Sequence, residues 1–293
     1  MKPFDPDFLK KLERFILYSR RPVLGIAGGN RRSRAKGSAI EFSDFREYTL
    51  GDDYRSIDWN AYARFERLFV KLYMEEQEAN VTVFLDVSAS MDSGEPNKGT
   101  LARELAAVFA GISLANYDRV GIAAIDDGVR KELPSFSGKA GIPKALGFLE
   151  GIEFRGRTDL RRALKAYGPL CGRGISILLS DLFSEGGENG FREAMQYLKF
   201  QGQDVIVIPV LSPQELDPAF EGALRLIDAE TGESVEVEMT PHVFHLYQKK
   251  LYDFLGERQS ICESMEISWV PVQSGVSLDR LVFDTFPQAG IIR

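Results

Sequence analysis

The 293-residue sequence has few of the side chains that hold transition metals or build disulfide frameworks, with only 2 Cys and 2 His. Cys171 and Cys262 lie far apart without metal-type or redox-type spacing, so we expect reduced thiols in a cytoplasmic protein. His242 and His245 have no cysteine or third histidine nearby, and we interpret them as ordinary helix residues. No apolar run approaches the roughly 18 to 20 residues that a membrane span needs. The sequence therefore predicts no membrane span and no Cys/His metal centre.

Motifs that identify common enzyme classes are also absent. The sequence has no G-x-S-x-G of serine hydrolases, no G-x-x-x-x-G-K-[ST] of P-loop enzymes and no G-x-G-x-x-G of dinucleotide binders. Asp86 ends a strand-like run, as the nucleophile of an aspartyl-phosphate phosphatase would, but Ser88 stands where that chemistry normally has a second acid. These absences favour a protein that is not an enzyme.

Acidic residues exceed basic ones overall, with 36 Lys and Arg against 43 Asp and Glu and a formal net charge of −7. The exception is residues 20–37 (RRPVLGIAGGNRRSRAKG), which contain six basic residues and no acidic one. Such a loop can contact phosphates or an acidic protein surface, but the chain lacks the overall basic excess typical of nucleic-acid binders. We favour a solvated loop and keep nucleic-acid binding through residues 20–37 as a weaker alternative.

From residue 81 onward the sequence alternates apolar runs with amphipathic segments. Four runs have the composition of buried parallel strands: Val81–Val87, Arg119–Asp126, Gly174–Asp181 and Asp204–Leu211. We also expect an edge hairpin partner over Val129–Leu133, a second hairpin within 224–240 and a last strand over Glu266–Val272. This alternation predicts an α/β fold with an open, mostly parallel, doubly wound sheet and helices on both of its faces.

The first 80 residues have a different pattern. Apolar residues at helical spacing predict a short helix over Phe8–Tyr18. The later run EFSDFREYTLGDDYRSIDWNAYARFERLFVKLY indicates short strands and turns. We therefore expect an N-terminal helix and an irregular, strand-containing attachment over residues 1–80, and the α/β domain over residues 81–293.

Oxygen-bearing side chains follow several of the predicted strand ends and loops. Asp86, Ser88 and Ser90 form a D-x-S-x-S motif directly after the first strand, while Thr158 precedes a helix and Asp181 ends a later strand. Each fragment alone is typical of a turn or a helix cap. Ligands of a doubly wound sheet bind beyond the carboxyl ends of its strands, so these side chains are expected at one edge. Carboxylate and hydroxyl oxygens suit Mg²⁺, or another divalent cation such as Mn²⁺ or Ca²⁺.

These motifs resemble the metal-ion-dependent adhesion site of von Willebrand factor type A domains, in which D-x-S-x-S is followed by a distant Thr and a later Asp. Upstream, GSAIEFSDFREYTLGDDYRSIDWNAYAR and LFVKLYMEEQEANVTVFLDVSASM resemble the signature of the bacterial family known as domain of unknown function fifty-eight. The resemblance runs through most of residues 25–211. It implies a von Willebrand A fold and a metal site of five residues: Asp86, Ser88, Ser90, Thr158 and Asp181.

In such sites the hydroxyls tend to contact the metal directly and the acids often act through water, which leaves one coordination position for a partner's carboxylate. The resemblance thus implies a metal-dependent protein-interaction module. Members of the family are commonly associated with MoxR-type AAA+ ATPases, which implies an adaptor role in complex assembly or stress response. The alternative is a magnesium-dependent phosphoesterase that uses Asp86 or Asp181 as base or nucleophile.

The upstream signature supplies a second set of candidates: Arg46, Asp52, Asp53, Arg55, Asp58, Trp59 and Arg64. One interpretation is a partner-docking surface next to the metal site. The other, which we favour from the sequence, is a buried cluster of ion pairs and a tryptophan that fixes the attachment to the sheet, because Asp/Arg pairs beside an aromatic ring are common structural locks.

Overall fold

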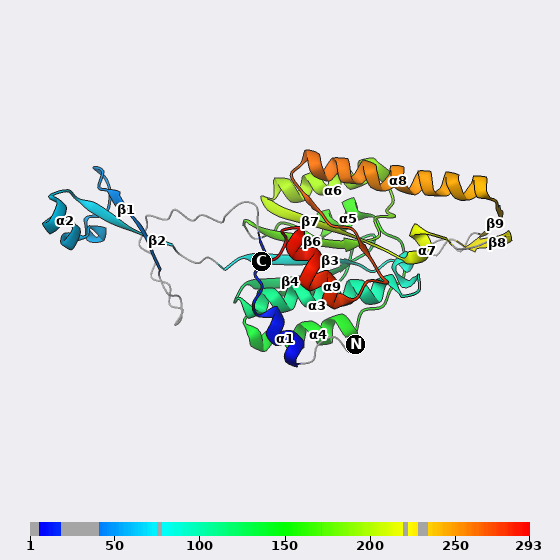
Figure 1. Ribbon diagram of the computed structural model, residues 1–293, viewed down its shortest axis with the longest axis horizontal. Coiled ribbons are helices and arrows are strands. Elements are labelled where there is room, and N and C mark those ends of the chain that lie inside the picture. The colour runs from blue at the N-terminus through cyan, green and yellow to red at the C-terminus, as the bar shows by residue number, and fades with distance from the viewer. Residues whose placement is uncertain (1–5, 19–40, 75–77, 171, 219–221, 228–233) are drawn as a thin grey trace. The chain divides into compact units, whose positions relative to one another are not determined.

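The computed structural model describes residues 6–18, 41–74, 78–170, 172–218, 222–227 and 234–293 (Figure 1). The basic segment 20–37, Cys171 and the turn of the second predicted hairpin lie outside the described residues. The chain divides into two compact units, Met1–Arg21 with Ala79–Arg293, called here the α/β unit, and Pro22–Glu78, called the small unit.

A single sheet forms the centre of the α/β unit. Within the described residues it has seven strands, in the order β10-β7-β6-β3-β4-β5, with β11 also beside β7. The strands are β3 (Asn80–Asp86), β4 (Arg119–Ile125), β5 (Val129–Ser137), β6 (Gly174–Ser180), β7 (Gln203–Leu211), β10 (Ser268–Trp269) and β11 (Val272–Gln273). β5 pairs antiparallel with β4 at the edge, as its hairpin position predicted, and the other described pairings of the sheet are parallel.

Helices cover both faces of this sheet (Figure 1). One core contains residues of α1 (Pro6–Leu12), α3 (Lys98–Ala115) and α4 (Ile142–Glu150), and the other contains residues of α5 (Leu160–Tyr167), α6 (Gly187–Phe200) and α8 (Pro241–Ser264). Successive residues of β3 alternate between the cores: Val83 and Leu85 belong to the first and Phe84 to the second. Burial on both faces explains why the strands are continuous apolar runs, and it confirms the predicted doubly wound α/β fold.

The N-terminal helix ends earlier than the apolar spacing predicts. α1 stops at Leu12, and Leu17 instead forms an antiparallel bridge with Ile292 near the other end of the chain. The backbone N–H of Ile16 donates to the carbonyl of Arg293 at 2.8 Å. A pairing with a segment so distant in sequence overrides the local helical spacing.

The last predicted strand is interrupted at Pro271, between β10 and β11. Proline has no backbone N–H, so it cannot continue the ladder with β7. The chain then forms α9 (Leu278–Arg280), a π-helical turn (Leu281–Thr285) and α10 (Phe286–Gln288). The predicted second hairpin is present as β8 (Gly222–Ile227) paired with β9 (Ser234–Met239), and it follows the short helix α7 (Pro213–Leu216).

In its described residues, the small unit consists of an antiparallel strand pair and one α-helix. β1 (Glu41–Glu47) pairs with β2 (Phe69–Met74), and between them lie a 3₁₀ turn (Tyr54–Ser56) and α2 (Trp59–Phe65). Ile57, Ala61 and Val70 supply its buried apolar side chains. Asp58 caps α2 by accepting hydrogen bonds from the N–H groups of Asn60 and Ala61.

None of the helices in the described part of the chain combines the length and the apolar character that crossing a membrane requires. His242 and His245 are exposed in the first turns of α8. Cys262, on the same helix, is a free and buried thiol whose pKa burial raises to about 12.

We expect Phe109→Ala to destabilise the α/β unit by about 3 to 5 kcal/mol, because the ring is fully buried on α3 and its loss leaves a cavity beside Phe286, 5.3 Å away between ring centroids. Urea denaturation followed by circular dichroism measures this change. The matched control is Phe200→Ala, whose ring is 89% exposed and whose loss should change stability by less than about 0.5 kcal/mol. Equal effects of the two substitutions would contradict the assigned core.

Candidate metal centre

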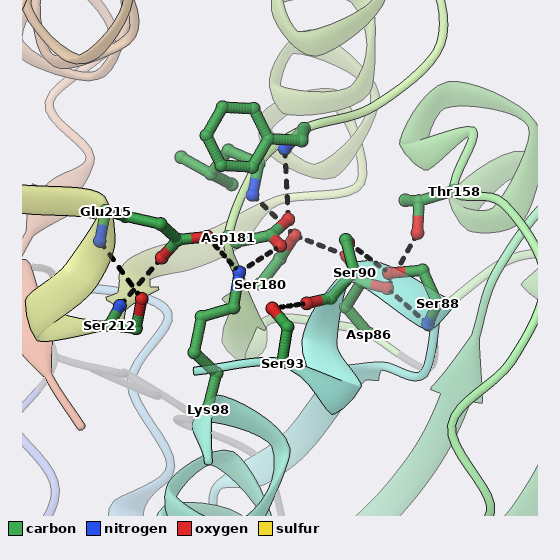
Figure 2. A network of polar contacts seen from close by, with 12 residues as sticks. Asp86, Ser88, Ser90, Ser93, Lys98, Thr158, Ser180, Asp181, Ser212 and Glu215 are labelled. Atoms are coloured by element: carbon green, nitrogen blue, oxygen red, sulfur yellow. Dashed lines mark hydrogen bonds and ion pairs between the residues drawn. The ribbon is translucent and has the colours of Figure 1, made fainter. Parts of the chain in front are cut away.

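The five residues of the predicted metal site lie around the carboxyl ends of β3 and β6 (Figure 2). Asp86 ends β3, and Ser88 immediately precedes a 3₁₀ turn (Ala89–Asp92) that contains Ser90. Asp181 follows the last residue of β6, the strand beside β3, and Thr158 lies in the loop before α5. The structure therefore brings these side chains to one edge of the sheet, although they come from segments far apart in sequence.

The Asp86 carboxylate is fully buried and accepts three hydrogen bonds. Its Oδ1 accepts from the backbone N–H of Ser88 at 3.0 Å and from the Thr158 hydroxyl at 2.7 Å, and its Oδ2 accepts from the Ser180 hydroxyl at 2.5 Å. The hydroxyls of Ser88 and Ser90 lie 3.0 Å apart beside it. Ser180 is not one of the five predicted ligands. Its hydrogen bond holds the carboxylate of Asp86, which is one of them.

Burial and the nearby charge of Asp181 together raise the pKa of Asp86 to about 6, although the hydrogen bonds from Ser180, Thr158 and Ser88 oppose the change. A low-dielectric site disfavours the charged carboxylate unless a cation compensates it. The site therefore holds negative charge at an energetic cost that a bound divalent cation would relieve.

A buried lysine that we did not predict from the sequence lies in the same network. Lys98 is the first residue of α3 and is fully buried. Its ammonium donates to Asp181 Oδ2 at 2.8 Å and to Glu215 Oε1 at 2.5 Å (Figure 2). The carboxylates of Asp181 and Glu215 outweigh the opposing effect of burial and raise the pKa of this lysine. The sequence did carry a signal, because Lys98 is on the same helical stripe as the buried Leu101 and Leu105.

The loop that carries Thr158 is held from several sides. The carbonyl of Thr158 accepts from the N–H of Glu185 at 2.8 Å, and the N–H of Asp159 donates to the carbonyl of Asp126 at 3.1 Å. Asp159 also caps α5 through the N–H of Arg162 at 3.0 Å. The Thr158 hydroxyl is thus positioned by backbone contacts that do not depend on a bound ion.

The donor set fits a hard divalent cation. It consists of carboxylate and hydroxyl oxygens, and the neighbouring side chains Asp86, Asp181, Glu215 and Lys98 carry a formal net charge of −2. In the described part of the chain, no group of three or more His, Cys, Asp or Glu is arranged to hold a metal. A cation at this edge would therefore depend on the hydroxyls of Ser88, Ser90 and Thr158.

The seven residues of the upstream signature lie together in the small unit. Arg46 pairs with Asp52 at 2.7 Å on the surface, and contacts with the N–H of Thr49 and with Arg46 lower the pKa of Asp52 to about 2. Asp53 caps the 3₁₀ turn, and Asp58 caps α2. The remaining three residues of the set are exposed on the unit: Arg55, Trp59 and Arg64.

Trp59 is 62% exposed, so the small unit by itself does not bury this tryptophan, and the interpretation of these residues as a cluster that fixes the attachment to the sheet stays a prediction. The acids instead accept hydrogen bonds from nearby turn and helix N–H groups, which satisfies them without burying the tryptophan.

Comparison with known proteins assigns the family. The family model described as "Protein of unknown function DUF58" matches residues 44–253, most of the chain. The chain belongs to the DUF58 family. The sequence resemblance to this family is thereby confirmed, and the match includes the upstream signature from residue 44 onward and the five predicted metal ligands.

Proteins of similar sequence occur in mycobacteria. A protein of Mycobacterium tuberculosis described as uncharacterized is 25% identical over 250 residues, covering 81% of this chain and 75% of that protein. Among solved structures, the conserved hypothetical protein BatB from Bacteroides thetaiotaomicron is 18% identical, with a TM-score of 0.47, and covers 72% of this chain and 98% of that one. Proximal thread matrix protein 1 from the mussel byssus, described with a zinc-occupied MIDAS motif, is 23% identical with a TM-score of 0.35, covering 46% of this chain and 38% of that one.

We expect Asp86→Asn to stabilise the metal-free protein at pH 7, because the folded protein raises the pKa of this carboxyl from 3.8 to about 6. A carboxyl with a raised folded-state pKa favours folding while protonated, so the wild type loses stability as the pH rises from about 4 through 6. At pH 7 the loss is roughly 3 kcal/mol. Thermal melts in a chelator should show the variant melting higher than wild type at pH 7 and equal to it near pH 4.

Asp159→Asn is the matched control, since asparagine caps a helix as well as aspartate does and this residue is partly exposed. It should melt like wild type at both pH values. A lower melting temperature of Asp86→Asn at pH 7 would show that the lost hydrogen bonds outweigh the relieved burial of charge.

Proposed function

We propose that this DUF58 protein is a metal-dependent protein-interaction module. A divalent cation, Mg²⁺ in the first place or Mn²⁺ or Ca²⁺, would be held at the carboxyl edge of the sheet by Asp86, Ser88, Ser90, Thr158 and Asp181. The observation that carries the proposal is the convergence of these oxygens around a buried, negatively charged network. When bound, the cation would supply a Lewis-acidic centre for a carboxylate of the partner protein.

The protein's own residues prepare this edge for a ligand. Ser90 is only half-buried, whereas Asp86 and Ser88 are fully buried, so the site is solvent-accessible on the side of the 3₁₀ turn. The hydroxyls are placed to meet the cation, and the acids balance its charge, as the family resemblance implies. Both oxygens of Asp86 accept hydrogen bonds, which does not favour this carboxylate as a free nucleophile in the phosphoesterase alternative.

The partner suggested by the family resemblance is a MoxR-type AAA+ ATPase, with the DUF58 protein acting as an adaptor in complex assembly or stress response. We also propose the seven upstream residues as a second docking surface on the small unit: Arg46, Asp52, Asp53, Arg55, Asp58, Trp59 and Arg64. Exposed Trp59 lies edge-on to Tyr62, with 6.2 Å between ring centroids, and such aromatic residues are enriched in interfaces.

We expect the wild type to bind one Mg²⁺, and the Ser88→Ala, Ser90→Ala double variant to bind it at least about tenfold more weakly, because two hydroxyl ligands are removed. Isothermal titration calorimetry measures both constants. Ser113→Ala is the control, since this buried serine on α3 donates to the carbonyl of Phe109 and is not a predicted ligand. Equal Mg²⁺ binding by all three proteins would overturn the metal site.

We expect a MoxR-type ATPase to be retained from the native lysate by immobilised wild type with Mg²⁺, but not with chelator and not by the Ser88→Ala, Ser90→Ala variant. Mass spectrometry identifies the retained proteins. Trp59→Ala should bind Mg²⁺ like wild type and retain less ATPase if the second docking surface is correct. Retention that is independent of Mg²⁺ would contradict the metal bridge, and turnover of a phosphoester that Asp86→Ala abolishes would favour the enzyme alternative.

A further inference from the structure

Lys98 occupies a fully buried position at the start of α3. It lies on the buried stripe of α3, and its side chain has no exposed surface. Burying an ammonium is costly unless it is paired, and replacing buried ion pairs by apolar groups is often neutral or stabilising. Packing alone therefore does not account for a lysine here.

Both partners of Lys98 are held rigidly toward it. Asp181 Oδ1 accepts from the N–H of Phe183 at 3.1 Å, which leaves Oδ2 for the ammonium. Glu215 Oε2 accepts from the N–H of Ser212 at 2.7 Å in a capping box, which leaves Oε1 for the ammonium. The ammonium thus joins a predicted metal ligand to an acid on α7 that the family resemblance does not include.

We propose that Lys98 and Glu215 are positioning residues that set the affinity of the metal centre in opposite directions. This inference rests on the proposed function. Lys98 places a positive charge on the same Asp181 carboxylate that a divalent cation needs, so it weakens cation binding. Glu215 neutralises part of the lysine's charge from the other side, so it strengthens cation binding.

The same charges affect a partner's carboxylate in the reverse sense. With both residues present, the network has a formal charge of −2, which a divalent cation neutralises. Without the lysine, the network and its cation would keep a negative charge that repels an incoming carboxylate. Lys98 thus lowers the affinity for the cation and favours the binding of an acidic group of the partner. It is therefore a determinant of what the site binds.

The test measures Mg²⁺ binding by calorimetry in Lys98→Met, Glu215→Gln and the double variant. Lys98→Met should lower the Mg²⁺ dissociation constant about tenfold or more, and Glu215→Gln should raise it by a similar factor, since each removes one unit charge close to the site. The double variant should fall between the two. Lys98→Arg, which keeps the positive charge, should stay closer to the wild-type dissociation constant than Lys98→Met does.

A purely structural ion pair predicts a different pattern, in which Lys98→Met and Glu215→Gln both melt lower and change Mg²⁺ affinity in the same direction or not at all. That result overturns the inference. If Lys98→Met fails to fold, Glu215→Gln is the deciding variant, because it keeps Lys98 paired with Asp181. A Mg²⁺ dissociation constant of Glu215→Gln that is equal to or lower than that of wild type overturns the inference. A wild type that binds no Mg²⁺ overturns the proposed function as well. If the Ser88→Ala, Ser90→Ala variant loses Mg²⁺ binding while the variants of Lys98 and Glu215 bind Mg²⁺ like wild type, only the role of Lys98 and Glu215 is overturned.

Discussion

The burial of the Asp86 carboxylate at the end of the central strand is the constraint on which the site depends. The side chain donors that satisfy it come from β6 and from the loop before α5, and a backbone donor comes from the turn after β3. Leaving such a charge without these partners would cost several kcal/mol. The carboxylate therefore ties three separate segments together, and the oxygens that it gathers are the same ones that suit a divalent cation.

The position of the site follows from the parallel sheet. β3 and β6 are neighbours and run in the same direction, so Asp86 and Asp181 emerge at one edge although 95 positions in sequence separate the two residues. The helices cover the two faces of the sheet and leave that edge open. The motif residues could therefore be grouped from sequence, because strand ends were recognisable as the ends of apolar runs and a doubly wound sheet places such ends together.

Other features could not be predicted because they depend on contacts between distant segments. Leu17 leaves the helical pattern to pair with Ile292, and no local spacing signals that bridge. Lys98 and Glu215 are 117 positions apart, and although the helical stripe signals the burial of Lys98, no local pattern signals that the two residues pair. The sequence also left two interpretations of the residues around Trp59 open, because an acid beside an arginine indicates an ion pair equally well in a buried cluster and in a surface turn.

Stability and binding make opposite demands on this edge of the sheet. A fully apolar edge would favour folding, whereas three buried or partly buried acids compensated by one lysine keep the network negative. Strongly perturbed charges of this kind cluster at functional sites. Because the hydrogen bonds of Asp86 and the backbone contacts of Thr158 hold the oxygens in place without an ion, the cation would bind to a prepared site rather than assemble one. The free energy of cation binding would then stabilise a complex in which a partner supplies the last oxygen ligand. An interaction module requires this property.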